Sequence, residues 1–289
     1  MILLHHPSCI EYGSFERPEQ PARIIRSEAH LRKVHPDWEW QKAGAAGESL
    51  ILQAHEPALI ARLQHAPDLD ADTPWFPGIR DHARRAVGAG LAAAAAALAG
   101  RKAFSLMRPP GHHCTRTQAM GFCYLNQIAI AAVNTAQAGH RVAVWDFDAH
   151  HGNGTEDILK GRPGVLFASV HQFPGYPGTG THSADNCKNF PVAPHSPRST
   201  HLAALARSWD AVLAFNPDLI LVSAGFDAYL HDPITQMTLE RADFAELGRW
   251  LGGTNVPSAA ILEGGYSADL PLLIDDFLSA WEKTTPLSA

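Results

Sequence analysis

The sequence has few cysteines, and their spacing does not indicate a disulfide framework or a zinc ribbon. Only four cysteines occur among 289 residues, and no two of them form a Cys-x-x-Cys pair. A chain of this length can build a stable core without disulfides. We therefore expect free thiols in a reducing compartment, with the cytoplasm as the predicted location, at Cys9, Cys114, Cys123 and Cys187.

The sequence also lacks a basic leader and a long hydrophobic run. Its first residues, MILLHHPSCIEYG, contain neither the basic segment nor the extended apolar segment of a secretory signal. The longest apolar stretch, GLAAAAAALAG at 90–100, is rich in alanine and too short to span a bilayer. We expect this stretch to be a packed helix, and we expect no membrane partner.

A basic excess and the common nucleotide motifs are missing as well. The chain has 23 Lys+Arg against 29 Asp+Glu, a net charge of −6 at pH 7. Direct binding of nucleic acid is not expected, because phosphates are neutralised by clustered positive charge. There is no Gly-x-Ser-x-Gly elbow, P-loop or Gly-x-Gly-x-x-Gly fingerprint, so serine hydrolase, NTPase and dehydrogenase functions have no support.

The composition favours a large α/β domain. Hydrophobic residues make up 46% and charged residues 18%, which is typical of a globular core. Short apolar runs alternate with helical patterns, which predicts a parallel sheet with helices on both faces. No linker or repeat divides the chain, so one domain over 1–289 is expected. The predicted strands are 1–6, 103–107, 141–147, 164–170, 218–224 and 258–263, and the predicted helices are 21–34, 57–65, 80–99, 126–138, 155–160, 199–215, 239–252 and 269–283.

The loops that follow the strands after residue 100 are rich in Gly, Pro, His and Asp. Ligands of open α/β sheets bind at the carboxyl ends of the strands. Five strand ends should therefore bring a set of reactive side chains to one side of the molecule. These are His112, His113, Asp146, Asp148, His150, His151, His171, Asp227 and Tyr266.

The segment VWDFDAHHGN at 144–153 indicates a metal site. Asp148 and His150 are separated by one residue, so on an extended segment their side chains point the same way. Asp227 arrives from another strand end. Two carboxylates and one imidazole leave an open position for water on a divalent metal, the arrangement of a catalytic site. A lone Asp-x-His is more often a salt-bridged pair, but the further acid and the tandem histidines favour the metal.

The adjacent His112 and His113 could be metal ligands, acid–base groups or surface residues. The acid–base role is favoured if each ring has its own partner, and Asp146 and Asn153 are available. An aspartate partner favours the imidazolium, whereas an asparagine leaves the pKa nearer to neutral. Tyr266 follows two glycines and could donate to a developing oxyanion, or could simply pack at the end of the sheet.

These features together predict hydrolysis of an amide or ester by metal-activated water. Two aromatic residues in glycine-bearing loops, Phe122 and Tyr176, could wall a narrow apolar slot on the same face. Isolated aromatic residues are more often plain packing.

Six ordered motifs resemble those of the zinc-dependent histone deacetylase superfamily, which includes acetylpolyamine amidohydrolases and bacterial acetoin-utilization proteins. They are RPPGHH, GFCYLNQIAIAA, WDFDAHHGNGTEDIL, SVHQFPGYPGTG, SAGFDAYLHDP and LEGGYS. HHGNGT, with Asn rather than Asp, is similar to the class II branch. RPEQPARI resembles the family's His-Pro-Glu-x-Pro-x-Arg pattern, with Arg17 in place of His. The resemblance implies an arginase-like three-layer αβα fold with a mostly parallel central sheet.

The resemblance also implies roles for the matching positions. Zinc, or iron(II) in the cell, would be bound by Asp148, His150 and Asp227. His113, oriented by Asn153, would be the general base and then the acid. His112, paired with Asp146, would stabilise charge, and Tyr266 would hold the acyl oxygen. A structural potassium ion would be ligated by Asp146, Ser169 and the carbonyl groups of Asp148, His150 and Val170. The tunnel for the acyl-lysine chain would be lined by Gly121, Phe122, Tyr176, Ile234, Gly264 and Gly265.

Two departures from the family pattern bear on the substrate. Ile234 lies where polyamine-selective relatives can carry a glutamate, and the loop around 70–77 is short. Both favour deacylation of N-ε-acyl-lysine over acetylpolyamine hydrolysis, which is the alternative. A protein that binds acyl-lysine with little turnover is a weaker alternative. An acylated lysine or amine is the expected partner, and the oligomeric state is open.

Overall fold

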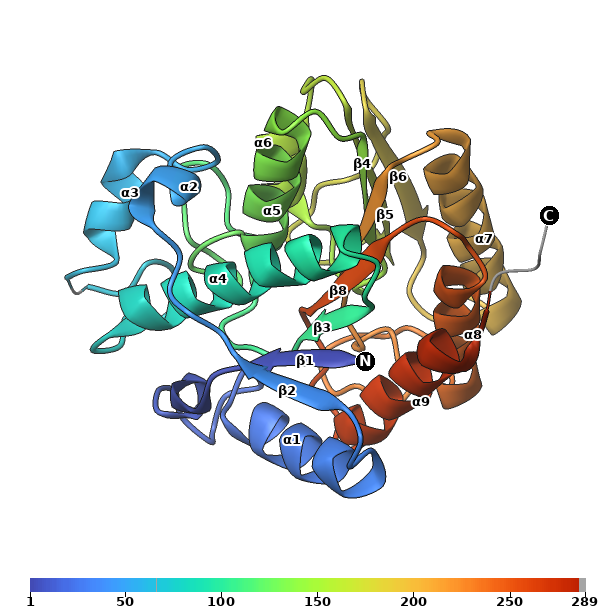
Figure 1. Cartoon of the computed structure of the whole chain (residues 1–289), viewed down its shortest axis with the longest axis horizontal. Helices are drawn as coiled ribbons and strands as arrows, with labels where there is room; N and C mark the ends of the chain where they lie inside the picture. The colour runs from blue at the N-terminus through green and yellow to red at the C-terminus, as the bar shows by residue number, and fades with distance from the viewer. Residues whose placement is uncertain (66, 286–289) are drawn as a thin grey trace.

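The structure is a computed structural model that describes residues 1–65 and 67–285. Its centre is an 8-stranded sheet with the order β2-β1-β3-β8-β7-β4-β5-β6 (Figure 1). All pairings between these strands are parallel, so the sheet is wholly rather than mostly parallel. The strands are β1 (Ile2–His5), β2 (Glu39–Lys42), β3 (Ala103–Ser105), β4 (Val142–Asp146), β5 (Val165–Gln172), β6 (Cys187–Val192), β7 (Leu219–Ala224) and β8 (Ser258–Leu262).

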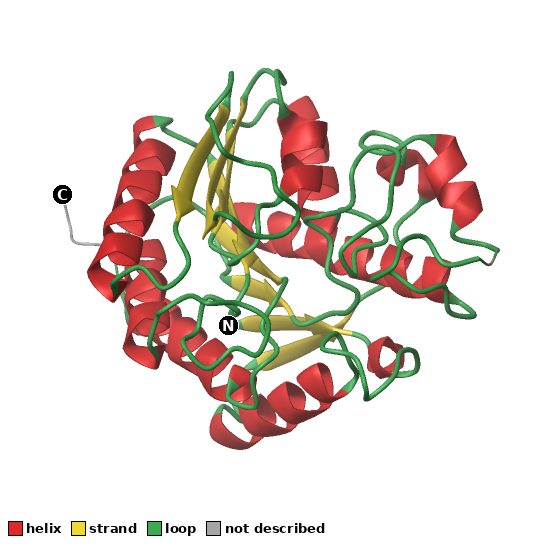
Figure 2. Ribbon diagram, turned by 180° about the vertical axis from the view of Figure 1, so that it is seen from behind, coloured by secondary structure: helices red, strands yellow, loops and turns green. Residues whose placement is uncertain are grey.

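Helices cover both faces of the sheet, which is the predicted three-layer αβα arrangement (Figures 1 and 2). One layer contains α4 (Ile79–Leu98), α5 (Gln127–Gln137) and α6 (Asn153–Leu159), with the short α2 (Glu48–Ile51) and α3 (Pro57–Arg62) beside them. The other layer contains α1 (Ala22–Val34), α7 (Arg198–Ala214), α8 (Arg241–Gly252) and α9 (Leu270–Lys283). A 3-10 helix, Pro7–Ile10, follows β1. None of the helices in the described ranges has the length and hydropathy that a bilayer crossing needs.

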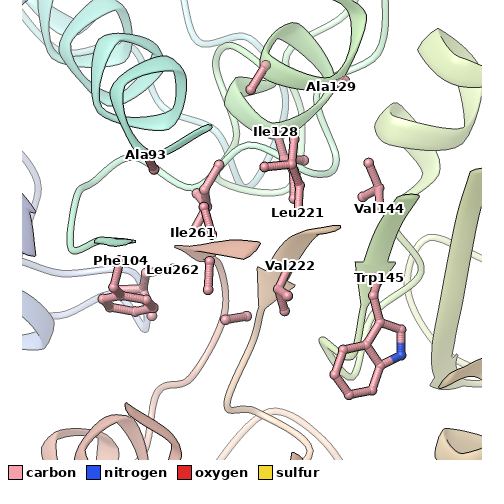
Figure 3. Packing of buried hydrophobic residues seen from close by; sticks show 14 of the residues in the cluster. Ala93, Phe104, Ile128, Ala129, Val144, Trp145, Leu221, Val222, Ile261 and Leu262 are labelled. Atoms are coloured by element: carbon pink, nitrogen blue, oxygen red, sulfur yellow. The ribbon is translucent and has the colours of Figure 1, made fainter. Parts of the chain in front are cut away.

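The central strands are continuously apolar because both of their faces are covered. Every residue of β4 and of β7 is buried. Successive side chains alternate between the two helical layers. Figure 3 shows this alternation in β4, where Val144 points toward the layer that holds Ile128, while Trp145 points toward the opposite layer. Packing against helices on both faces of the sheet holds the central strands, and therefore their carboxyl ends, in place.

The two strands that the sequence did not predict lie at the two edges of the sheet. β2, with the sequence EWQK, is largely exposed, and β6 contains Pro191, which cannot donate a hydrogen bond to a neighbouring strand. The predicted strands after residue 100 occupy adjacent positions, β3-β8-β7-β4-β5. Their carboxyl ends therefore form one continuous row, and the candidate site lies along it.

Candidate active site

Three possible metal ligands meet beyond the carboxyl ends of β4 and β7. The side chains of Asp148 and Asp227 are fully buried, and that of His150 is 14% exposed. One ligand atom from each residue lies within 4.8 Å of the others. His150 Nδ1 is 2.8 Å from Asp227 Oδ2 and 3.2 Å from Asp148 Oδ1. Two carboxylates and one imidazole in this arrangement are a donor set suited to a divalent metal ion.

Glycines leave the space that the two carboxylates occupy. A Cβ atom at Gly225 would lie 2.0 Å from Asp148 Oδ2, and one at Gly264 would lie 2.3 Å from Asp227 Oδ2. The N–H of Gly264 donates to Asp148 Oδ2 at 2.7 Å, and that of Ala149 donates to Asp227 Oδ1 at 2.8 Å. Such backbone donors orient the ligands from behind, so the residues present fit a bound metal.

This close approach predicts the effect of adding one methyl group. In Gly225→Ala the new Cβ must displace the Asp148 carboxylate, so we expect metal affinity to fall by about 10–100-fold, as is common when support for a metal ligand is lost. Competition with a fluorescent chelator measures this affinity. Gly44→Ala is the matched control, because nothing lies within 4 Å of a Cβ at that position. Equal affinities of the two variants would contradict the prediction.

Oxygen atoms with few protein partners lie next to the metal ligands. Asp146 Oδ1 accepts a hydrogen bond of 3.1 Å from the N–H of Asp148. Ser169 Oγ is 2.9 Å from His171 Nδ1, and both Ser169 and Val170 are fully buried. Within the described part of the chain, no hydrogen bond reaches the carbonyl oxygen of Asp148 or of His150. Oxygen donors of this kind are suited to a hard cation.

The two adjacent histidines have different partners. His112 Nδ1 lies 3.0 Å from Asp146 Oδ2, and His113 Nδ1 lies 2.8 Å from the amide oxygen of Asn153. The two rings are 4.0 Å apart between centroids. If the asparagine oxygen accepts from Nδ1–H, Nε2 of His113 carries the lone pair. The structure thus brings together both His–partner pairs for which the sequence supplied candidates.

The surroundings of the two rings give them different charges. Burial disfavours the charged form of His112, but the carboxylates of Asp148 and Asp146 raise its pKa to about 10. Burial, together with the charges of His112 and His150, holds the pKa of His113 well below its usual value. At neutral pH His112 is therefore cationic, and His113 is neutral and able to accept a proton.

The tyrosine of the loop after β8 has a free hydroxyl group. Tyr266 lines the same cavity as His113 and His150. Burial raises the pKa of this phenol well above its ordinary value, although the nearby Arg23 opposes that shift. The hydroxyl forms no hydrogen bond with any residue in the described ranges. Tyr266 is therefore a neutral donor available to a ligand.

Three charged residues that sequence reasoning did not single out hold this loop in place. Arg23 donates to the carbonyl groups of Gly265, at 2.8 Å, and of Glu263, and its guanidinium lies 4.9 Å from the centroid of the Tyr266 ring. The carboxylate of Glu263 accepts from the N–H of Gly111 at 2.7 Å, which joins this loop to the one that carries the histidines.

The third residue, Asp232, joins the tyrosine loop to the loop after β7. One of its oxygens accepts from the N–H of Tyr266 at 2.8 Å, and the other accepts from the N–H of Ile234 at 3.1 Å. Burial raises the pKa of Asp232 to about 7, and the nearby carboxylate of Asp227 adds to the effect. Arg23, Glu263 and Asp232 all lie within the motifs quoted above, but the motifs do not indicate these contacts, because most of them join segments that are far apart along the chain.

A cavity of about 310 Å³ opens above the candidate site. Gly264 and Gly265, which were expected to line it, do not: Gly264 packs against the metal-ligand carboxylates, and Gly265 supports the loop from behind. Two charged residues, Arg17 and Asp72, lie among its walls without having been predicted there. The lining residues are Arg17, Pro18, Asp72, His113, Gly121, Phe122, His150, Tyr176, Ile234 and Tyr266.

Comparison with known proteins explains this arrangement. A family model described as the histone deacetylase domain matches residues 17–275. The chain belongs to the histone deacetylase family. Its central sheet and two helical layers are accordingly the arginase/deacetylase fold, and the expected family and fold are confirmed.

Named members of the histone deacetylase family extend the comparison. A histone deacetylase-like amidohydrolase of Pseudomonas aeruginosa is 36% identical over 282 residues, which cover 88% of this chain and 73% of the relative. An acetylpolyamine amidohydrolase of Mycoplana ramosa is 32% identical over 288 residues, which cover 90% of this chain and 84% of the relative. A crystal structure of an acetylpolyamine aminohydrolase from Burkholderia pseudomallei superposes with a TM-score of 0.90 at 27% identity, covering 99% of both chains. Family and relatives support an enzyme that hydrolyses amides.

Proposed function

We propose that this histone deacetylase family member hydrolyses the acetyl amide of a linear primary alkylamine, with zinc held by Asp148, His150 and Asp227. One observation carries the proposal: a single cavity joins a metal-ligand set, a neutral imidazole with a free nitrogen, and a phenol with a free hydroxyl. These are the parts required for acyl transfer to water.

The reaction can be followed through the groups of this chain. A metal ion held by Asp148, His150 and Asp227 would polarise the acyl group as a Lewis acid and would bring the pKa of water near neutrality. Nε2 of His113 accepts a proton from the water as the C–O bond forms. The same nitrogen returns that proton to the amine as the C–N bond breaks, so the products are the free amine and acetic acid, which releases its remaining proton to solvent and becomes acetate. Tyr266 donates a hydrogen bond to the acyl oxygen, on which negative charge develops.

His112 contributes charge rather than proton transfer. Its Nδ1 lies against Asp146, and its Nε2 is 3.8 Å from Asp148 Oδ1. A cationic ring there offsets the buried carboxylates and keeps His113 neutral. We further propose potassium as the hard cation that uses the buried oxygen donors of Asp146, Ser169 and the nearby carbonyl groups. Iron(II) is an alternative to zinc, since mixed N/O ligands suit both.

Small acetylated amines are the favoured substrate class. The relatives named as acetylpolyamine amidohydrolases support this class better than the lysine of an intact protein, which reverses the order expected from Ile234 and the loop at 70–77. A peptide acyl-lysine is the second candidate, because Ile234 supplies no negative charge at the cavity for a polycation. The free groups of His113 and Tyr266 argue against a binding protein without turnover.

Metal removal and return test the proposed function. Chelated protein should lose hydrolysis of N-acetylputrescine and of an acetyl-lysine peptide, and one equivalent of zinc should restore it. Asp227→Ala should bind less zinc and stay inactive after zinc is added, because one ligand is missing. Asp276→Asn is the control, since Asp276 pairs with Arg241 on the surface. The proposal fails if zinc-loaded protein releases no acetate from either substrate.

A further inference from the structure

Two charges of opposite sign lie unpaired at the cavity above the candidate site. Arg17 and Asp72 both line this cavity, and both line a second, smaller cavity that shares Phe122 with the first. Within the ranges that the structure describes, no ion pair within 4.0 Å forms at either side chain. Two free charges beside an apolar slot provide a place for a ligand that carries both signs.

The segment that carries Asp72 is fastened to the wall of the cavity. The carboxylate of Asp70 accepts from the N–H of Asp72 at 2.9 Å and from the N–H of Gly121 at 3.4 Å. The N–H of Phe122 donates to Thr73 Oγ1 at 3.0 Å. Asp72 is therefore held near the mouth without using its own carboxylate.

The segment that carries Arg17 is also anchored. Two residues further along, Glu19 is bound by both the Nε and the Nη2 of the buried Arg108, at 2.5 and 2.7 Å. Arg108 is fully buried, so the backbone after Arg17 is fixed to the core. The Arg17 guanidinium remains free and presents a planar set of donors that matches a carboxylate.

We propose that the far end of the substrate carries a carboxylate that pairs with Arg17, beside an ammonium group that pairs with Asp72. The substrate class is then a free amino acid acetylated on its side-chain amine, such as N-ε-acetyl-lysine. This inference rests on the proposed function, because it assigns the substrate of the same cavity. An acetylpolyamine offers only the ammonium, and an acyl-lysine within a peptide offers neither charge.

Four amide substrates of equal chain length distinguish the contribution of the carboxylate from that of the ammonium group. N-ε-acetyl-lysine carries both charges, N-acetylcadaverine only the ammonium, 6-acetamidohexanoate only the carboxylate, and N-pentylacetamide neither. We expect Arg17→Gln to lower kcat/KM at least tenfold for the two carboxylates and less than twofold for the other two. Asp72→Asn should lower the values for the two ammonium compounds instead.

Control variants separate recognition from folding and from net charge. Arg17→Lys should recover part of the activity on the carboxylates, because it keeps the charge but loses the planar donor pair. Arg207→Gln removes the same charge from an exposed position of α7 and should change none of the four values. Selective loss that fades at high salt supports an ion pair.

Two results would overturn the inference. Arg17→Gln could lower all four values equally, which is a structural effect, or it could change none of them. If the zinc-loaded wild type hydrolyses no amide, the proposed function fails instead. Calorimetric binding of N-ε-acetyl-lysine then decides the inference: weaker binding to Arg17→Gln supports it, and equal binding contradicts it.

Discussion

Replacing Tyr266 with phenylalanine should lower kcat about 10²–10³-fold and change KM much less. Loss of one oxyanion donor typically has this effect. The ring itself should stay in place, because it is flanked by the Arg23 guanidinium at 4.9 Å and by the Phe122 ring at 5.9 Å. The hydroxyl has no hydrogen-bond partner in the described part of the protein. Steady-state kinetics on an acetylated amine, together with Tm, measure the change.

The same cavity offers a matched control for this substitution. Tyr176→Phe also removes one phenolic hydroxyl, but its ring lies against His113, 5.0 Å away between centroids, and is 37% exposed. We expect its kcat to stay within about threefold of the wild type, since its hydroxyl is assigned no role at the acyl oxygen. An equal loss of kcat in the two variants would mean that removing either hydroxyl disturbs the cavity, and it would contradict a specific role for Tyr266.

Replacing His113 with glutamine should lower kcat about 10²–10⁴-fold, the usual contribution of a positioned acid–base group. Glutamine fills a similar space and can still approach Asn153, but it cannot carry a proton between water and amine. The loss should shrink on an activated aryl ester, because a phenolate leaves without needing a proton. The ratio of kcat on amide and ester therefore measures the acid role separately.

His140→Gln is the control for this variant. His140 follows α5 and precedes β4, so it lies at the opposite end of that strand from the metal ligands. It should keep wild-type kcat on both substrates. If His113→Gln kept more than a tenth of the wild-type kcat on the amide, another group would have to be the base.

The elements that the sequence predicted are those with a strong pattern. The buried central strands are continuous apolar runs, so they were visible, and their carboxyl ends were expected to meet. The edge strands β2 and β6 lack such a run, because an edge strand tolerates charged residues and proline: β2 has the sequence EWQK, and β6 has the sequence CKNFPV. The amino-acid order alone does not contain the pairing partners that make these segments strands.

The sequence indicates the reactive side chains of the site, but it does not indicate the residues that hold their loops in place. Asp148 and His150 occur within three residues of each other, and their chemistry is visible in the sequence. Arg23 and Glu263 lie 240 residues apart and meet only after folding. The resemblance places the two glycines before Tyr266 in the cavity wall. In the structure Gly264 instead makes room for the carboxylates of Asp227 and Asp148, and the carbonyl group of Gly265 accepts from Arg23, which only the packing reveals.

The carboxylate that joins the main chains of Tyr266 and Ile234 couples substrate specificity to turnover. Asp232 accepts from both N–H groups, so a loop remodelled to admit a new substrate also moves the tyrosine. For directed evolution, we expect substitutions of the Ile234 side chain that keep Asp232 to change the cavity wall while leaving the hydrogen bond to the Tyr266 main chain in place.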